Sequence, residues 1–304
     1  MEYSYEDKLE MAKELRDTSA INPNISPELE KFVDLVNHEE KNIETSEGNT
    51  HIYIITPMES KDIYPLYINL HGGGFVRGHK DKDTILCSKI ALNCGCKVID
   101  VDYKVAPEYP FPVAFNECYY VVNWVVAHAE ELHIDKEKVV LGGYSAGASF
   151  TAAIALKANK TKDFKLKRQI INYALLDMVN DEEQKFKAIK DISEHDTILA
   201  KRGKKFAFLY LENENDKSNL YASPILATKE MLMDLPPALI IVGGKDFLRY
   251  ENQEYAMKLV DAGVEVKIKK FVNSNHGLIE NFQPGYEEAH DLIIETLKQS
   301  FYND

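Results

Sequence analysis

The sequence predicts an α/β fold with a mostly parallel central sheet flanked by helices and with a helical cap. Apolar runs of strand length alternate along the chain with longer helical patterns, and most of these runs are continuously apolar. Continuously apolar strands are typical of sheets covered by helices on both faces. Two polar, helix-biased stretches interrupt the alternation, and they indicate an additional element outside the sheet.

The predicted strands are the short apolar runs, and the predicted helices are the longer segments between them. The strands lie at 65–70, 97–102, 138–142, 169–174, 238–242 and 264–268. The helices lie at 81–94, 113–131, 146–159, 250–263 and 284–301. Strands that alternate with helices form parallel sheets, and the chemistry of such sheets is carried by loops at the carboxyl ends of the strands.

The two stretches that break the alternation are candidates for the cap. Residues 1–40 have a helical pattern ahead of any strand, and residues 178–222 are polar, charged and helix-biased. We expect both to cover the site, because an enclosed pocket needs a roof; surface decoration is the alternative interpretation. Without a linker or an internal repeat, residues 1–304 are expected to form a single domain that includes this cap.

Charge and hydropathy exclude several classes of partner. The 36 basic and 49 acidic residues give a net charge of −13, which repels nucleic acid. No window holds the roughly 18 consecutive apolar residues of a membrane span. The first residues are acidic and lack the apolar stretch of a secretory signal, so we expect a cytoplasmic location. Four cysteines are too few for a disulfide framework, and their spacing does not indicate a metal site.

The pentapeptide Gly143-Tyr144-Ser145-Ala146-Gly147 has the pattern G-x-S-x-G and stands between a predicted strand and a predicted helix. A sharp strand-to-helix turn crowds the backbone around its central serine, so glycine on both sides removes Cβ clashes and exposes the hydroxyl. Ser145 is therefore the candidate nucleophile. A glycine-serine turn without a function is the alternative.

A second glycine-rich loop, His71-Gly72-Gly73-Gly74, follows the first predicted strand. Consecutive glycines leave backbone N–H groups uncovered, and a developing oxyanion requires such groups as preorganised donors. We predict an oxyanion hole formed by the N–H groups of Gly73 and Gly74 together with the N–H of Ala146, which follows the nucleophile. A flexible glycine turn is the alternative.

A serine hydroxyl becomes a strong nucleophile only when a base takes its proton, and the base needs a carboxylate to hold its tautomer. Of nine histidines, His276 is the candidate base because it lies in a turn-rich loop after the last predicted strand. Asp246 follows the strand at 238–242 and is the candidate carboxylate, with Asp177 as its rival. The chain order Ser145, Asp246, His276 is typical of one class of serine hydrolases with a parallel sheet.

Together these motifs resemble the hormone-sensitive lipase family of esterases, a branch of the α/β-hydrolase fold. The resemblance is carried by the loop that begins at His71, the stretch 102–112, the turn at Ser145 and the segment 246–277. It implies an α/β-hydrolase fold with a helical cap. It also implies a serine carboxylesterase that cleaves short- to medium-chain acyl esters through an acyl-enzyme, without a metal or an organic cofactor. Relatives in this family often pair, so the resemblance suggests a homodimer.

The chain departs from the family pattern at three positions. Tyr144 replaces an acidic residue before the nucleophile, Ala148 replaces a glycine, and Tyr250 replaces an acidic residue after Asp246. These departures bear on the hydrogen bonding around Ser145 and on the width of the acyl pocket.

Two other functions would use the same residues. An amidase or a formamidase-like hydrolase would share the triad and differ only in the pocket for the leaving group. A non-catalytic receptor would keep the fold and bind a small ligand under the cap, and such proteins tend to lose a member of the triad. Tyr, Phe and Leu side chains within 206–211 are candidates for the pocket lining.

Overall fold

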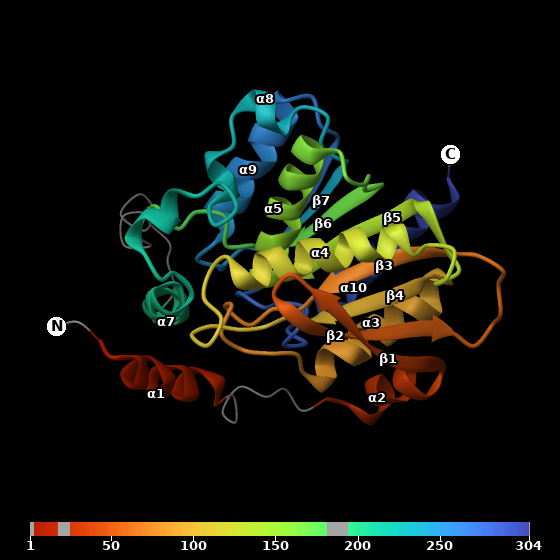
Figure 1. The fold of residues 1–304 in the computed structure, drawn as a ribbon, viewed down its shortest axis with the longest axis horizontal. Coiled ribbons are helices and arrows are strands. Elements are labelled where there is room, and N and C mark those ends of the chain that lie inside the picture. Colours follow the sequence, from red (N-terminus) through yellow and green to blue (C-terminus); the bar gives the residue numbers. More distant parts are fainter. Residues whose placement is uncertain (1–2, 18–24, 181–193, 304) are drawn as a thin grey trace.

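The structure is a computed structural model that describes residues 3–17, 25–180 and 194–303, with a large sheet at its centre (Figure 1). The strands are β1 (Val36–Thr45), β2 (Gly48–Pro57), β3 (Tyr64–Leu70), β4 (Lys97–Asp102), β5 (Ile134–Tyr144), β6 (Arg168–Asn172), β7 (Ala238–Gly243) and β8 (Val266–Phe271). The α-helices are α1 (Tyr5–Arg16), α2 (Pro27–Asp34), α3 (Asp81–Cys94), α4 (Val113–Ala127), α5 (Ala146–Thr161), α7 (Glu194–Tyr210), α8 (Lys229–Leu232), α9 (Arg249–Asp261) and α10 (Tyr286–Tyr302). Two short 3-10 helices are η1 (Glu214–Ser218) and η2 (Pro224–Leu226).

The strands of the sheet have the order β1-β2-β4-β3-β5-β6-β7-β8. From β4 to β8 neighbouring strands are parallel, whereas β2 is antiparallel to β4 and β1 is antiparallel to β2. Both β3 and β7 are buried at every position. Strands covered on both faces need long apolar runs, which is why the sequence identifies them. The predicted α/β fold with a mostly parallel sheet is confirmed.

Helices cover the two faces of the sheet (Figure 1). Leu66 and Ile68 of β3 belong to the buried cluster that includes side chains of α4 and α5. Tyr67, between them in the sequence, belongs to the cluster that includes side chains of α3 and α10. Because successive side chains of a strand point to opposite faces, these two pairs of helices lie on opposite sides of the sheet.

The hairpin of β1 and β2 is the main difference from the sequence prediction. The predicted helical pattern of residues 1–40 is wrong from Val36 on, where β1 begins. Among the described strands, β1 is an edge strand that pairs with β2 alone, and charged side chains such as those of Glu39 and Glu40 are exposed along it. Polar edge strands lack the apolar run by which strands are recognised, although they protect a sheet from edge-to-edge association.

Helices from both stretches of the predicted cap meet at one side of the sheet, where α1 lies beside α7 (Figure 1). The rings of Tyr3 and Phe208 pack edge to face with centroids 5.2 Å apart. Arg16 ties α1 to the body of the protein through hydrogen bonds from Nη1 to Glu108 Oε1 at 2.7 Å and from Nε to the carbonyl of Val76 at 2.9 Å. α2 packs instead against α3. Part of the predicted cap, 181–193, lies outside the described residues.

Candidate active site

Ser145 occupies the sharp turn between β5 and α5. Its φ of 50° and ψ of −114° are unusual for a residue with a Cβ, and the turn is held by a hydrogen bond from its N–H to the carbonyl of Asn172 at 2.9 Å. The turn brings Gly147 against the end of β3, where an added Cβ would lie 2.0 Å from the carbonyl oxygen of Leu70. Glycine is therefore required at position 147 for this approach.

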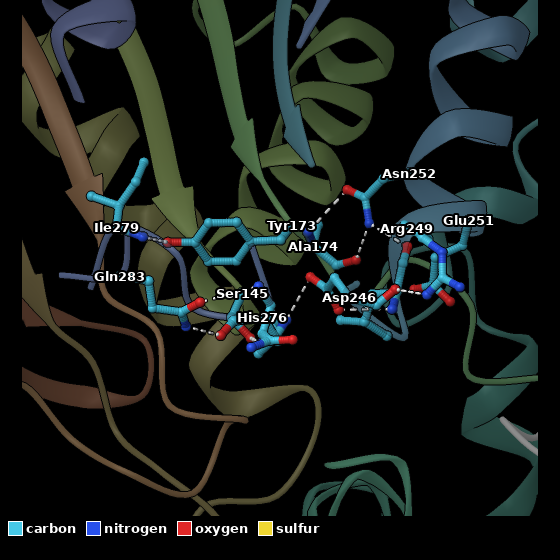
Figure 2. A network of polar contacts seen from close by, with 12 residues as sticks. Ser145, Tyr173, Ala174, Asp246, Arg249, Glu251, Asn252, His276, Ile279 and Gln283 are labelled. Atoms are coloured by element: carbon cyan, nitrogen blue, oxygen red, sulfur yellow. Dashed lines mark hydrogen bonds and ion pairs between the residues drawn. The ribbon is translucent and has the colours of Figure 1, made fainter. Parts of the chain in front are cut away.

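The side chain of His276 reaches Ser145 from the loop after β8 (Figure 2). Its Nε2 lies 2.9 Å from Oγ of Ser145, and its Nδ1 lies 2.9 Å from Oδ2 of Asp246. An ionised carboxylate only accepts hydrogen bonds, so Nδ1 carries a proton and Nε2 is left to accept the hydroxyl proton of Ser145. The structure thus brings together the three side chains that the sequence analysis nominated.

Asp246 is held in a fully buried position after β7. Its Oδ1 accepts a hydrogen bond from the N–H of Leu248 at 2.9 Å, and its carbonyl accepts one from Nη1 of Arg249 at 2.6 Å. The rival Asp177 instead closes a turn, where its Oδ1 accepts hydrogen bonds from the N–H groups of Val179 and Asn180. Of these two carboxylates, Asp246 is therefore the one that orients His276.

The charges around His276 favour its protonated form. Burial acts against the imidazolium, but the charge of Asp246 and the hydrogen bond to it, together with the charges of Glu280 and Glu251, raise the pKa of His276 above its ordinary value. An imidazole stabilised in this way accepts a proton from a hydroxyl more readily.

Gln283 fixes the loop that carries His276, and the sequence analysis did not identify it. Its Nε2 donates to the carbonyl of His276 at 2.8 Å, and its Oε1 accepts from the N–H of Asn275 at 3.1 Å. Tyr173 supports the following turn through its hydroxyl, which accepts a hydrogen bond from the N–H of Ile279 at 3.3 Å. No spacing in the sequence distinguishes these contacts from those of surface residues.

The glycine-rich loop after β3 borders the same space as Ser145. Gly73 and Gly74 have φ angles of 140° and 63°, which favour glycine. Within the described part of the chain, the N–H groups of Gly73, Gly74 and Ala146 have no hydrogen-bond partner, and all three residues line the cavity in front of Ser145. Tyr103 holds the start of the loop, since its hydroxyl donates to the carbonyl of His71 at 2.6 Å.

The cavity in front of Ser145 has a volume of about 480 Å³. Its apolar wall consists of the side chains of Phe75, Leu175, Ile198, Phe206, Phe247 and Leu248. Phe206 is thus the member of the segment 206–211 that lines the cavity, whereas Tyr210 is buried beside it and stacks on Phe75 with ring centroids 4.0 Å apart. Aromatic and aliphatic walls of this kind suit the hydrocarbon part of a small ligand.

The three departures from the family pattern occupy different environments. Tyr144 is fully buried, and its hydroxyl has no hydrogen-bond partner among the described residues. Ala148 is packed in the apolar cluster that contains side chains of α9. Tyr250 is 45% exposed. None of the three lines the cavity.

The described residues include neither a cluster of metal ligands nor a membrane-spanning helix. Among residues 3–17, 25–180 and 194–303, no group of three His, Cys, Asp or Glu side chains is arranged to hold a metal ion. In the same part of the chain, no helix combines the length and the apolar character needed to cross a bilayer.

Comparison with curated proteins identifies relatives among esterases. An arylesterase from Saccharolobus solfataricus is 32% identical over 203 residues, which are 66% of this chain and 63% of that protein. The esterase LipI from Mycobacterium tuberculosis is 30% identical over 217 residues, which are 71% of this chain and 66% of that protein. The chain spans just under two thirds of the length of these two relatives.

Solved structures share the fold over almost the whole chain. A hyperthermophilic esterase from the archaeon Pyrobaculum calidifontis has a TM-score of 0.83 and 26% identity, with 96% of this chain and 93% of that chain covered. A mutant of the esterase rPPE has a TM-score of 0.85 and 25% identity, with 96% of this chain and 91% of that chain covered.

A family model described as alpha/beta hydrolase fold matches residues 67–280. The matched segment is well over half of the 304 residues, and it contains Ser145, Asp246, His276 and the glycine-rich loop. The chain therefore belongs to the α/β-hydrolase family, and its resemblance to the hormone-sensitive lipase-like esterases of that family is confirmed.

Proposed function

We propose that this protein is a serine carboxylesterase that hydrolyses short- to medium-chain acyl esters. The observation that carries the proposal is the chain of two hydrogen bonds that links Ser145 to His276 and His276 to Asp246, each 2.9 Å long, at the wall of a largely apolar cavity. Relatives named arylesterase and esterase support an ester as the substrate.

In the first step of this mechanism, Ser145 attacks the ester carbonyl carbon. Its Oγ forms a bond to that carbon while Nε2 of His276 takes the hydroxyl proton, and Asp246 stabilises the resulting imidazolium. The carbonyl oxygen becomes an oxyanion that accepts hydrogen bonds from the N–H groups of Gly73, Gly74 and Ala146. His276 then gives its proton to the departing alcohol, which leaves an acyl group on Ser145.

The second step releases the acid and restores the enzyme. A water molecule gives a proton to Nε2 of His276 and attacks the acyl carbonyl, which again forms an oxyanion in the same hole. When this intermediate collapses, the bond from Oγ to the acyl carbon breaks and His276 returns the proton to Ser145. No redox step is required.

A cap above the site is part of the proposal, within one domain that spans residues 1–304. Ile198 and Phe206 of α7 contribute to the cavity wall, and α1 packs against α7. These contacts support a roof over the ester that would shield the acyl-enzyme from bulk water. A cytoplasmic location and a homodimer are proposals that rest on the sequence alone.

The experiment that tests the proposed function compares an ester with an amide of the same acyl group. We expect hydrolysis of 4-nitrophenyl butyrate to be far faster than hydrolysis of the butyryl 4-nitroanilide, and Ser145→Ala to abolish both. Ser88→Ala is the matched control, because Ser88 is a buried helical serine that does not line the cavity. Faster cleavage of the anilide would favour an amidase, and unchanged ester cleavage by Ser145→Ala would contradict the assigned nucleophile.

A further inference from the structure

The lining of the cavity includes more positive than negative side chains, in a protein whose net charge is −13. The cationic residues that line it are Arg77, Lys80, Lys82 and Arg202. The carboxylates that line it are Asp83 and Glu280. Hydrolysis of an acyl ester needs none of these charges. Their presence beside an apolar wall indicates a ligand that binds the cationic side chains.

Arg77 is a partly buried cation of the cavity wall. Its Nε donates a hydrogen bond to the carbonyl of Leu15 at 2.6 Å, which fixes the guanidinium, and its carbon Cζ lies 5.2 Å from the centroid of the Phe206 ring. Its Nη2 is buried and has no hydrogen-bond partner among the described residues. Arg77 nevertheless lines the cavity, and its partly desolvated positive charge is weakly screened, so a ligand anion in the cavity would be attracted to it.

Arg202 approaches the same space from α7. Burial first, and then the positive charge of Arg202, lower the pKa of Arg77 to about 10. Neither guanidinium forms an ion pair with a carboxylate of the described residues. The negative charge of Glu280, which also lines the cavity, opposes this shift in the pKa of Arg77. Two neighbouring guanidinium groups still attract an anion, and a planar carboxylate fits their donors best.

The two carboxylates of the cavity offset only part of this positive charge. Oδ2 of Asp83 accepts a hydrogen bond from the N–H of Lys80 at 2.9 Å. Burial, together with the charge of Asp100, raises the pKa of Asp83 to about 7, which favours its neutral form. Glu280 faces the backbone of Gly72, where an added Cβ would lie 2.1 Å from its Oε1.

We propose that the preferred esters of this site carry a second, anionic group, a carboxylate, which Arg77 and Arg202 bind while the ester lies at Ser145. The inference deepens the proposed function and rests on it for the reaction itself. The phenyl rings of Phe206 and Phe247 then contact the hydrocarbon segment between the ester and the carboxylate. A free alkyl end would instead leave the two guanidinium charges without a ligand anion.

The test uses two pairs of esters that differ only in a terminal carboxylate. Monomethyl adipate is compared with methyl hexanoate, which places the carboxylate on the acid side of the ester bond. 5-Acetoxypentanoate is compared with pentyl acetate, which places it on the alcohol side. Proton release at constant pH gives kcat/KM for each ester, and the wild-type protein is expected to prefer the charged member of at least one pair.

Substitution of either arginine should reduce this preference. We expect Arg202→Met and Arg77→Met each to lower the charged-to-neutral ratio of kcat/KM by about tenfold, the effect of losing one charge-assisted hydrogen bond. Lys201→Met is the matched control, since Lys201 is the exposed neighbour of Arg202 on α7 and does not line the cavity. The control should keep the wild-type ratio, whereas a general effect of charge would lower the ratio in all three variants.

Binding distinguishes failure of this inference from failure of the proposed function. Calorimetry with Ser145→Ala measures binding of the same esters without turnover, and the charged ester should bind more tightly unless Arg202→Met is added. Tighter binding of the charged ester that depends on Arg202, without hydrolysis by the wild-type protein, would support the anion site and contradict the proposed esterase activity. Hydrolysis with a ratio unchanged by Arg202→Met and by Arg77→Met would overturn the anion site alone.

Discussion

Nδ1 of His276 lies 2.9 Å from Oδ2 of Asp246, and the carboxylate has no exposed surface. Little water screens this pair, so the negative charge of Asp246 acts strongly on the imidazole. Its effect, together with those of Glu280 and Glu251, outweighs the opposing effect of burial and raises the pKa of His276. The same contact fixes the tautomer in which Nε2 faces Ser145.

The raised pKa predicts how ester hydrolysis depends on pH. Only neutral His276 can take the proton of Ser145, so kcat/KM should fall as the pH is lowered through the pKa of His276. Asp246→Asn removes the charge that favours the imidazolium, and we expect the acid inflection to move to lower pH. The rate above the inflection should fall by roughly 10⁴, because the asparagine amide also favours the wrong tautomer. An acid inflection that Asp246→Asn leaves in place would show that another group titrates.

The close contact of Gly147 with β3 predicts a large effect of a single methyl group. In Gly147→Ala the Cβ would meet the carbonyl oxygen of Leu70 at 2.0 Å, and backbone atoms cannot move aside as a side chain can. We expect the free energy of unfolding to fall by about 3 kcal/mol or more and esterase activity to be lost. Urea denaturation measures the first and nitrophenyl ester hydrolysis the second.

Gly263→Ala is the control for this prediction. Gly263 has a φ of 85°, but no atom lies within 4 Å of an added Cβ. Its replacement should cost only about 1 kcal/mol of backbone strain and leave kcat/KM unchanged. Equal losses of stability in the two variants would show that the conformation of glycine, and not the contact with β3, determines the effect.

The two buried tyrosines near the site predict opposite responses to loss of a hydroxyl. Tyr144 has a buried hydroxyl without a described partner, so Tyr144→Phe should raise the free energy of unfolding by about 1 kcal/mol. The hydroxyl of Tyr103 donates to the carbonyl of His71 at 2.6 Å, so Tyr103→Phe should lower it by a similar amount. Thermal and urea unfolding of both variants measure these changes. Destabilisation by Tyr144→Phe would show that the hydroxyl of Tyr144 has a hydrogen-bond partner.

The pair of His79 and Asp100 predicts a loss of stability at high pH. Nε2 of His79 lies 2.7 Å from Oδ2 of Asp100, and both side chains are buried. Burial lowers the pKa of His79, but the charge of Asp100 and the hydrogen bond to it raise the pKa from 6.5 to about 9. Because the folded-state pKa is the higher one, the contribution is complete below pH 6.5 and is lost as the pH rises through about 9.

His79→Gln isolates this contribution from other groups that titrate at high pH. Between about pH 6 and about pH 10, the wild-type protein should lose about 3 kcal/mol more unfolding free energy than His79→Gln. Urea denaturation at the two pH values gives both differences. A difference of the opposite sign would mean that burial, and not Asp100, governs His79.

Much of the fold follows from local sequence signals, because the buried strands are apolar on both faces. The strands from β3 to β7 could be predicted in this way. The edge strand β8 could be predicted from short apolar and charged alternation, and the order of the triad residues from their motifs. β1 could not be predicted, because most of its side chains are polar or charged and exposed. It is held by its pairing with β2, which leaves no local pattern. The placement of α1 beside α7 could not be predicted either, because it depends on contacts such as that between Arg16 and Glu108.

The motifs also locate the reacting groups better than the groups around them. Ser145 stands in a pattern that a strained turn requires, whereas Gln283, Arg77 and Glu280 reach the site through long-range packing that leaves no local pattern. The substrate-binding side chains are of this second kind. For this reason the sequence predicts the reaction more closely than the substrate.

The most direct test of the account is covalent labelling of the nucleophile. A fluorophosphonate reacts with a serine whose proton is taken by a neighbouring base, and the phosphonyl oxygen then occupies the oxyanion hole. Mass spectrometry should find one label on the peptide that contains Ser145, and Ser145→Ala should stay unlabelled. A folded wild-type protein that takes up no label, or that carries it on another serine, would contradict the proposal that Ser145, His276 and Asp246 act together.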